Sequence, residues 1–217
     1  MKLLSNFDLK IFALLFMTID HIGLIFEFGD IFRIIGRLAF PIFAFLIYQG
    51  YNYTKSKIHY FLRLLIFGLL IEGAMQGISL FVEIDASRNI FFTLSFGLLV
   101  LLISDSKFHF IIRVLSISIV LLIASLLNFD YGWYGILFIF SFHFYRHGFY
   151  IPIILQVILS FIYNYIYDSP IQYYALLSWI LIILYNNRRG YRIKYLFYIY
   201  YPLHLVVLYI VFLILYQ

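Results

Sequence analysis

Apolar runs separated by short polar stretches fill the chain from end to end. Runs of this kind predict helices, and a helix that crosses a bilayer needs about 20 apolar residues. No linker, repeat or low-complexity tract interrupts the series, so we expect one integral membrane domain over residues 1–217. The nine predicted helices cover residues 9–28, 34–53, 58–81, 90–104, 108–128, 131–146, 149–167, 171–186 and 193–216.

Polar residues mark where two of these helices begin. Ser5, Asn6 and Asp8 are N-cap candidates ahead of the first helix, and a turn at residues 168–170 places Pro170 in the first turn of the eighth. The first run has no Ala-x-Ala-like cleavage site, so we expect a retained membrane helix rather than a signal peptide.

Composition agrees with this architecture. Hydrophobic residues make up 65% of the 217 residues and charged residues only 12%, which lies outside the range of soluble domains. The sequence therefore predicts an all-α, polytopic transmembrane bundle. Because the chain has no cysteine, disulfides, thiolate nucleophiles and Cys-ligated metal centres are excluded.

Basic residues are distributed unevenly among the loops. With the N-terminus in the cytoplasm, alternate loops place 12 of the 15 basic residues inside and leave Arg33, Arg37 and Arg88 outside. This bias follows the positive-inside rule and predicts an N-terminus inside and a C-terminus outside. The net charge of +5 is then a signal of orientation, and no nucleic-acid partner is expected.

Five ionisable residues lie within apolar helices or at the start of one. They are Asp20 and His21 in the first helix, Arg37 in the second, Glu72 in the third and His204 in the ninth. A charge near the bilayer centre costs about 2.5–3.5 kcal/mol, so each is expected to face the bundle interior with a partner. At about 1.5 Å per helical residue, all five fall in one layer between the midplane and the outer surface.

Two interpretations of this layer remain open. In the first, Asp20 or Glu72 neutralises Arg37, and His204 is a core residue bonded to a tyrosine. In the second, an imidazole accepts a proton from a nucleophile while a carboxylate orients the ring. Neighbouring helical residues point about 100° apart, so Asp20 and His21 are expected to serve different partners. No metal site is expected, because the His-Glu-x-x-His spacing typical of zinc proteases is absent.

Several stretches form a recognisable series. In chain order they read MTIDHIG, IGRLAFPIFAFLIYQGYNYT followed by YFLRLL, NIFFTLSFGLL, YGWYGIL and KYLFYIYYPLHLVVL. This series resembles the TraX family of integral membrane proteins over nearly the whole chain, least so between residues 100 and 190. It is also distantly similar to membrane acyltransferases that use acyl-CoA. The positions that match include Asp20, His21, Gly36, Arg37, Pro41, Arg63, Asn89, Thr93, Tyr201, Pro202 and His204.

The resemblance implies an acetyltransferase, because the family is named for a protein associated with N-terminal acetylation of conjugative pilin. In that reading His21 or His204 is the general base and Asp20 orients it. Arg37 polarises the carbonyl or binds an acceptor carboxylate, and Glu72 belongs to the same catalytic set.

Acetyl-CoA is the donor that the resemblance implies, and its phosphates call for basic residues at the inner face. We expect the acceptor to contact Asn89, Thr93 and Tyr201. The expected residues for acetyl-CoA are Lys55, Lys57, Arg63, Arg188, Arg189 and Arg192.

The expected function is acetyl transfer at the inner (cytoplasmic) cell membrane. The acetyl group would pass from cytosolic acetyl-CoA to an amine or hydroxyl of an exported peptide, lipoprotein or envelope glycan. One alternative is a small proton-coupled membrane carrier, for which intramembrane Asp, Glu and His are also expected. The lack of internal repeats argues against a carrier. The other alternative is a non-catalytic assembly or scaffold protein.

Overall fold

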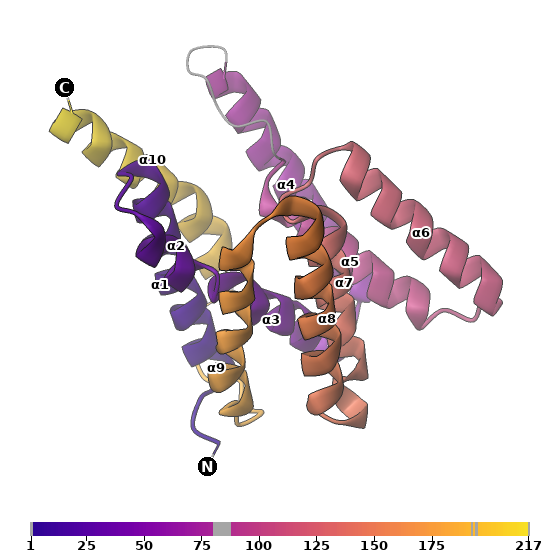
Figure 1. Cartoon of the computed structure of the whole chain (residues 1–217). Coiled ribbons are helices and arrows are strands. Elements are labelled where there is room, and N and C mark those ends of the chain that lie inside the picture. Colours follow the sequence, from indigo (N-terminus) through magenta and orange to yellow (C-terminus); the bar gives the residue numbers. More distant parts are fainter. Residues whose placement is uncertain (1, 80–87, 192, 194, 217) are drawn as a thin grey trace. The chain divides into compact units, whose positions relative to one another are not determined.

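The structure is a computed structural model that describes residues 2–79, 88–191, 193 and 195–216 (Figure 1). Within these residues the chain forms ten α-helices and two 3₁₀-helices, with only isolated β-bridges. The prediction of an all-α protein is confirmed. The chain divides into two compact units, Met1–Leu46 with Ile153–Gln217, and Ile47–Pro152.

The nine predicted helical segments correspond to the observed ones, with three differences in detail. The second segment is two helices, α2 (Asp30–Gly36) and α3 (Ala39–Tyr53). The sixth continues from an α-helix into a 3₁₀-helix, and the eighth begins as a 3₁₀-helix with Pro170 in its first turn, as predicted. The predicted end of the third helix at residues 80–81 lies outside the described residues.

The first unit is built around the N-terminal helix. Here α1 packs against α2 and α10, as Figure 1 shows. Leu14 and Met17 of α1 and Ala39 of α3 form a small core that α10 covers with Phe197 and its neighbours. The helices of this unit are α1 (Asn6–Ile25), α2, the first part of α3, most of α8 (Tyr150–Tyr167), η2 (Pro170–Ser178), α9 (Trp179–Ile183) and α10 (Leu196–Tyr216).

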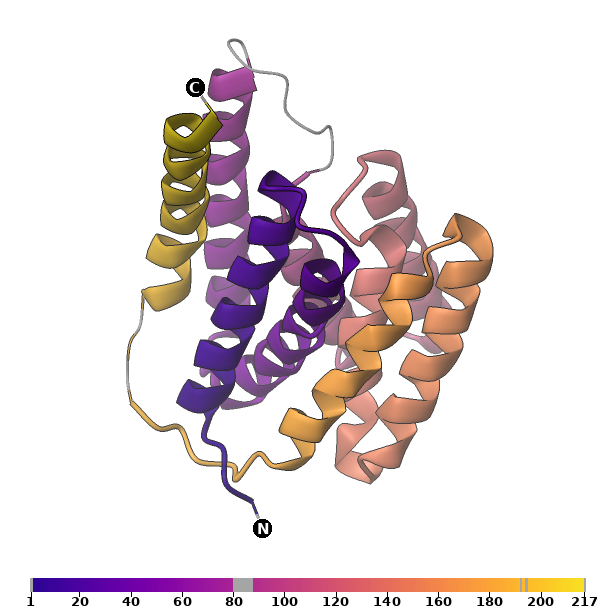
Figure 2. The same cartoon turned by 60° about the vertical axis from the view of Figure 1, so that its left-hand side comes forward.

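A capping box starts α1, which confirms Ser5 as the N-cap. The Ser5 hydroxyl accepts from the Asp8 backbone N–H, and the Asp8 carboxylate accepts from the Ser5 backbone N–H at 2.8 Å. The hydrogen bond from the Ser5 hydroxyl, and then the one from its backbone, hold the pKa of Asp8 below its usual range. Residues after α9 run beside this cap (Figure 2), where Asn6 N–H donates to the Arg188 carbonyl at 2.8 Å.

The break between α2 and α3 has a local cause. Pro41 has no N–H, so the Arg37 carbonyl lacks the partner that would continue a helix. Proline is accepted in the first turn of α3, where its missing donor would be unpaired in any case. The break separates the helix of Arg33 from that of Phe40 and leaves Arg37 at the turn.

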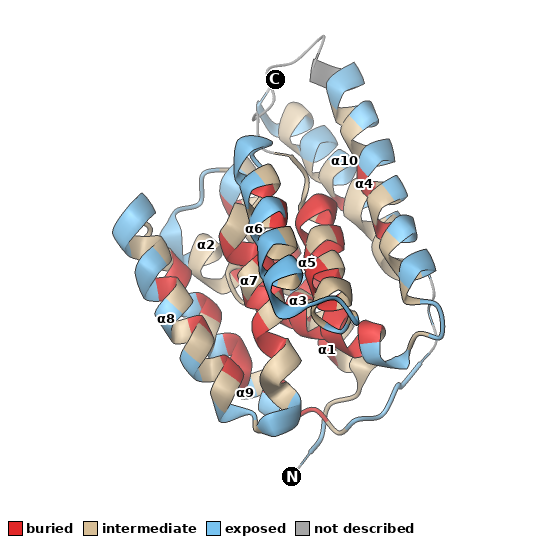
Figure 3. Ribbon diagram, turned by 90° about the vertical axis from the view of Figure 1, so that its right-hand side faces the viewer, coloured by how far each residue is buried: buried red, intermediate tan, exposed pale blue. Residues whose placement is uncertain are grey.

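In the second unit, α5 is the central helix. It packs against α4, α6 and α7, and most of its residues from Phe91 to Leu101 are buried (Figure 3). By contrast, α6 buries only Val120 and Ala124. The helices of this unit are the rest of α3, α4 (Lys57–Ser79), α5 (Ile90–Ser104), α6 (Phe110–Leu126), α7 (Gly132–Ser141) and η1 (Phe142–His147).

Several helices expose continuous apolar faces. On α6, Ile111, Leu115, Ile119 and Leu122 are exposed at spacings of three or four and form one stripe. Exposed stripes of this size are typical of lipid-facing helices. Four described segments are long and apolar enough to cross a membrane: Asp30–Tyr53, Lys57–Gly77, Tyr150–Tyr167 and Leu196–Tyr216.

Candidate functional site

The two histidines predicted to lie at a common depth are in direct contact in the first unit. His204 Nε2 lies 3.3 Å from His21 Nδ1, and the ring centroids are 4.9 Å apart at an angle of 72°. Each ring also faces a backbone carbonyl one turn earlier in its own helix. His21 Nδ1 lies 2.8 Å from the Met17 carbonyl, and His204 Nδ1 lies 2.9 Å from that of Tyr200.

A second polar cluster joins α1 to α2 through Asp20. Its Oδ2 accepts from Arg33 Nη1 at 2.8 Å, and its Oδ1 lies 3.9 Å from Arg37 Nη2. Oδ1 is buried and accepts no hydrogen bond within the described residues. The cluster thus brings two guanidinium groups to one carboxylate. The predicted pairing of Asp20 with Arg37 is therefore present, and Arg33 makes the closer contact.

Asp20 and His21 serve different partners, as predicted from their positions on one helix. Asp20 faces α2, whereas His21 faces α10. The carboxylate that was expected to orient an imidazole is engaged with the two arginines, and His21 is oriented by the Met17 carbonyl and His204.

Aromatic residues of α10 frame the histidine pair. The Tyr200 ring stacks on His204 with centroids 5.3 Å apart and 9° between planes, and its hydroxyl bonds Thr18 Oγ1 of α1 at 2.7 Å. Tyr201 meets His204 edge-on at 5.9 Å. His204 is only 6% exposed, and it lies two residues after Pro202, which has no backbone N–H to donate within the helix.

Glu72 belongs to the second unit, where its partners differ from the predicted Arg37. Its Oε1 accepts from Arg88 Nη1 at 2.9 Å, and its Oε2 accepts from Asn89 Nδ2 at 3.2 Å. Asn89 is also the N-cap of α5. The Thr93 hydroxyl donates to the Asp130 carbonyl, and Thr93 is fully buried. These contacts tie α4 and the α6–α7 loop to the start of α5.

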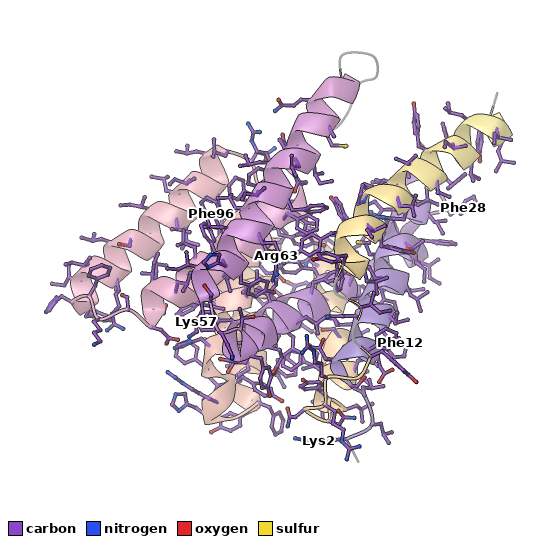
Figure 4. The ribbon with its side chains drawn as sticks, turned by 180° about the vertical axis from the view of Figure 1, so that it is seen from behind. Lys2, Phe12, Phe28, Lys57, Arg63 and Phe96 are labelled. Atoms are coloured by element: carbon purple, nitrogen blue, oxygen red, sulfur yellow. The ribbon has the colours of Figure 1, made fainter. Side chains whose placement is uncertain are left out.

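The basic residues expected to bind acetyl-CoA fall into two groups. In the second unit, Lys57 Nζ lies 3.8 Å from Asp105 Oδ2 and 3.9 Å from the Tyr51 ring centroid. Figure 4 shows Lys57 at the start of α4 and Arg63 farther along it, and Lys55 precedes this helix.

In the first unit, Arg188 and Arg189 are exposed beside the start of α1. Arg192 lies outside the described residues. Lys10, on the first turns of α1, lies 5.9 Å from the Phe197 ring centroid and adds a third basic residue at this end of the unit. No cluster of three or more potential metal ligands occurs among the described residues.

Sequence reasoning placed Arg33 on the outer side of the membrane and missed its contact with Asp20. A usable signal was present, because Arg33 and Arg37 are four residues apart and so lie on one helix face. Arg88 was missed in the same way, as the partner of Glu72. No sequence signal identifies that contact, because the two residues are brought together by the packing of α4 on α5.

Residues 5–212 match the family described as TraX protein. No solved structure gives a significant match.

Two curated relatives align with part of the chain. The chain is 29% identical over 147 residues to the probable fimbrial assembly protein FimC, serogroup H1, of Dichelobacter nodosus, covering 62% of this chain and 59% of that protein. It is 46% identical over 66 residues to the uncharacterized protein RP591 of Rickettsia prowazekii (strain Madrid E), covering 30% and 24%. The alignments therefore span less than two thirds of either relative.

Proposed function

The chain belongs to the TraX family, and from this premise we propose that it is an integral membrane acetyltransferase. The donor is cytosolic acetyl-CoA, and the acceptor is an amine or hydroxyl of an exported peptide, lipoprotein or envelope glycan. The observation that carries the proposal is the contact of His21 with His204 beside a cluster of Asp20, Arg33 and Arg37.

The histidine pair supplies the base that acetyl transfer requires. An amine or hydroxyl attacks a thioester faster when a neighbouring group removes its proton, and imidazole is the side chain best suited to this near pH 7. In this proposal one ring of the pair accepts the acceptor's proton and later returns it to the departing thiolate. A core histidine in an apolar helix needs one partner, and this site provides two imidazoles in contact.

The arginines supply positive charge where negative charge develops. Attack on the thioester carbonyl forms an oxyanion, and preorganised guanidinium donors stabilise such a charge. Asp20 holds Arg33 and Arg37 at this site, and in this proposal their guanidinium groups face the reacting carbonyl. Its buried Oδ1, without a hydrogen bond from the described residues, suits an N–H or O–H of the acceptor.

The donor would bind from the inner face. Arg188 and Arg189 are exposed at the end of the first unit where α1 begins, and Lys10 is on that helix. His21 follows Lys10 by eleven residues, or roughly 16 Å along α1. Guanidinium groups suit the phosphates of CoA because they bind oxyanions in a bidentate manner. In the second unit, Lys55, Lys57 and Arg63 remain the proposed contacts.

The acceptor is proposed to be exported. A catalytic layer toward the outer surface, in an inner-membrane protein with its N-terminus inside, favours acceptors that reach the external side. The name of the Dichelobacter nodosus relative refers to fimbrial assembly and agrees with an extracytoplasmic protein acceptor. Tyr201, beside His204, is the proposed acceptor contact in the first unit.

Two measurements test this function. CoA or acetyl-CoA should raise the thermal stability of the protein purified in lipid nanodiscs, by about 2.7 kcal/mol at 100 times its Kd. Mass spectrometry of envelope peptides and glycans should reveal a molecule that carries one more acetyl group in cells with the gene than in cells without it. A protein indifferent to CoA that moves a solute across vesicles would instead be a carrier.

A further inference from the structure

The hydrogen bonds at the histidine pair assign different roles to its two members. This inference rests on the proposed acetyl transfer, but its first step depends only on geometry. Both rings use Nδ1 to face a backbone carbonyl of their own helix, at 2.8 Å for His21 and 2.9 Å for His204. A carbonyl oxygen only accepts hydrogen bonds, so the nitrogen that faces it must carry the hydrogen.

Each neutral ring has one N–H, so its Nε2 carries a lone pair. The contact between the rings joins His204 Nε2 to His21 Nδ1 at 3.3 Å. The His21 Nδ1–H therefore donates to the His204 lone pair as well as to the Met17 carbonyl. In this arrangement both rings carry their hydrogen on Nδ1. The Nε2 lone pair of His204 accepts the hydrogen bond from His21.

We propose that His21 is the general base and that His204 is a positioning residue that acts through it. His21 Nε2 retains its lone pair and has no hydrogen-bond partner among the described residues. His204 is 6% exposed, and its Nε2 already accepts a hydrogen bond from His21. The reverse assignment would require His204 to release that bond before it accepted a proton.

The resulting reaction balances. His21 Nε2 takes a proton from the acceptor N–H or O–H as that atom bonds to the carbonyl carbon of acetyl-CoA. The tetrahedral intermediate collapses, the carbon–sulfur bond breaks, and the Nε2 proton passes to the departing sulfur. While His21 is an imidazolium, its Nδ1–H still donates to the Met17 carbonyl and to His204 Nε2, which stabilises the added charge.

Substitutions at position 204 separate positioning from catalysis. Glutamine places its carbonyl oxygen the same number of bonds from Cα as His204 Nε2, so His204→Gln keeps an acceptor for His21. Asparagine reaches only the Nδ1 position, so His204→Asn has similar polarity but leaves His21 without that acceptor. His21→Gln removes the base itself. His59→Ala, at an exposed histidine of α4 bonded to Ser56, is the control for loss of an unrelated imidazole.

The expected order of kcat follows from these roles. His204→Gln should stay within about tenfold of the wild type, the effect of altering one neutral hydrogen bond. His21→Gln should lose on the order of 10²–10⁴-fold, the contribution of a general base. His204→Asn and His204→Ala should lie between them, with the KM for acetyl-CoA unchanged, and His59→Ala should match the wild type. A His204→Gln variant as inactive as His21→Gln would overturn the assignment.

A second readout does not depend on activity. Protein with ¹⁵N-labelled histidine distinguishes protonated from unprotonated ring nitrogens by NMR, and the His21→Gln and His204→Gln spectra identify the two signals among the six histidines. Both rings should be protonated at Nδ1, and His21 should remain so in His204→Gln. Protonation at Nε2 of either ring overturns the inference. Correct tautomers without acetyl transfer by the wild type would refute the proposed function instead.

Discussion

Asp20 shows how a single residue sets the packing of its neighbours. Its carboxylate lies between Arg33 and Arg37, at the point where α1 and α2 approach closely. The approach depends on Gly36, because a Cβ at that position would collide with the Asp20 carboxylate. The position is a glycine because the two helices and the carboxylate leave no room for a side chain.

Gly36→Ala should therefore damage the site. We expect a loss of about 1–3 kcal/mol in the free energy of unfolding from overpacking, together with a strong loss of acetyl transfer as Asp20 is displaced. Gly73→Ala is the matched control, because a Cβ on this helical glycine of α4 meets no atom within 4 Å. It should be neutral or stabilising by up to about 1 kcal/mol. Chemical unfolding in mild detergent measures the free energy of unfolding of both variants. Equal losses for Gly36→Ala and Gly73→Ala would refute the steric argument.

At the scale of the element, helix ends and interruptions decide where the site residues point. The capping box of Ser5 and Asp8 fixes the start of α1, and the register of that helix then carries Asp20 and His21 to their partners. Pro41 separates α2 from α3, which leaves Arg37 in the turn between them, beside Asp20. The cap acts on Asp20, twelve residues after Asp8, and Pro41 acts on Arg37, four residues before it.

Ser5→Ala tests the role of the cap. The substitution removes the hydroxyl acceptor and should cost about 1 kcal/mol in the free energy of unfolding. The lowered pKa of Asp8 adds a pH dependence: its contribution is present above the ordinary carboxyl pKa of 3.8 and is lost as the pH falls through the lower folded value. Thermal unfolding of both proteins at several pH values measures the difference. A constant difference down to strongly acidic pH would contradict a cap that depends on the ionised carboxylate.

At the scale of the whole molecule, the distribution of charge predicts how the chain crosses the membrane. Nine crossings place the loop after α5 inside and the loop after α8 outside. The described structure supplies four long apolar segments, with shorter apolar helices at Ile90–Ser104, Phe110–Leu126 and Pro170–Ile183. The absence of cysteine makes this orientation directly measurable.

Single-cysteine labelling tests the topology. Ser106→Cys follows α5 and Ser169→Cys follows α8, and both replace a partly buried serine between two helices. A membrane-impermeant maleimide should label Ser169→Cys in intact cells, and Ser106→Cys only after the membrane is made permeable. The cysteine-free parent is the control for background. Labelling in the opposite order would invert the proposed orientation, and equal labelling of both would contradict the number of crossings between them.

Much of the fold was predictable from local pattern. The helical segments follow from the apolar runs, and the Ser5 cap follows from its short-range chemistry. The divergence of Asp20 and His21 toward different partners follows from helical geometry alone. These predictions succeeded because each depends on residues within a few positions of one another.

The pairing of residues far apart in the chain was only partly predictable. The cost of a buried charge predicted that Asp20, Arg37 and Glu72 would have partners, and it did not specify which. Arg33 took the closer place beside Asp20, and Arg88 paired with Glu72, through the packing of α1 on α2 and of α4 on α5. Depth along a helix does not determine the direction in which its face is turned.

The amino-acid sequence by itself determined that this protein is a bundle of apolar helices with a few costly polar groups inside, because hydrophobic length and helical period are local properties. Only the tertiary structure decided that His21 and His204, 183 positions apart, share a hydrogen bond. The physical reason is that the strength and direction of such a contact depend on how α1 and α10 are rotated about their axes, and that rotation is set by the packing of all the side chains between them.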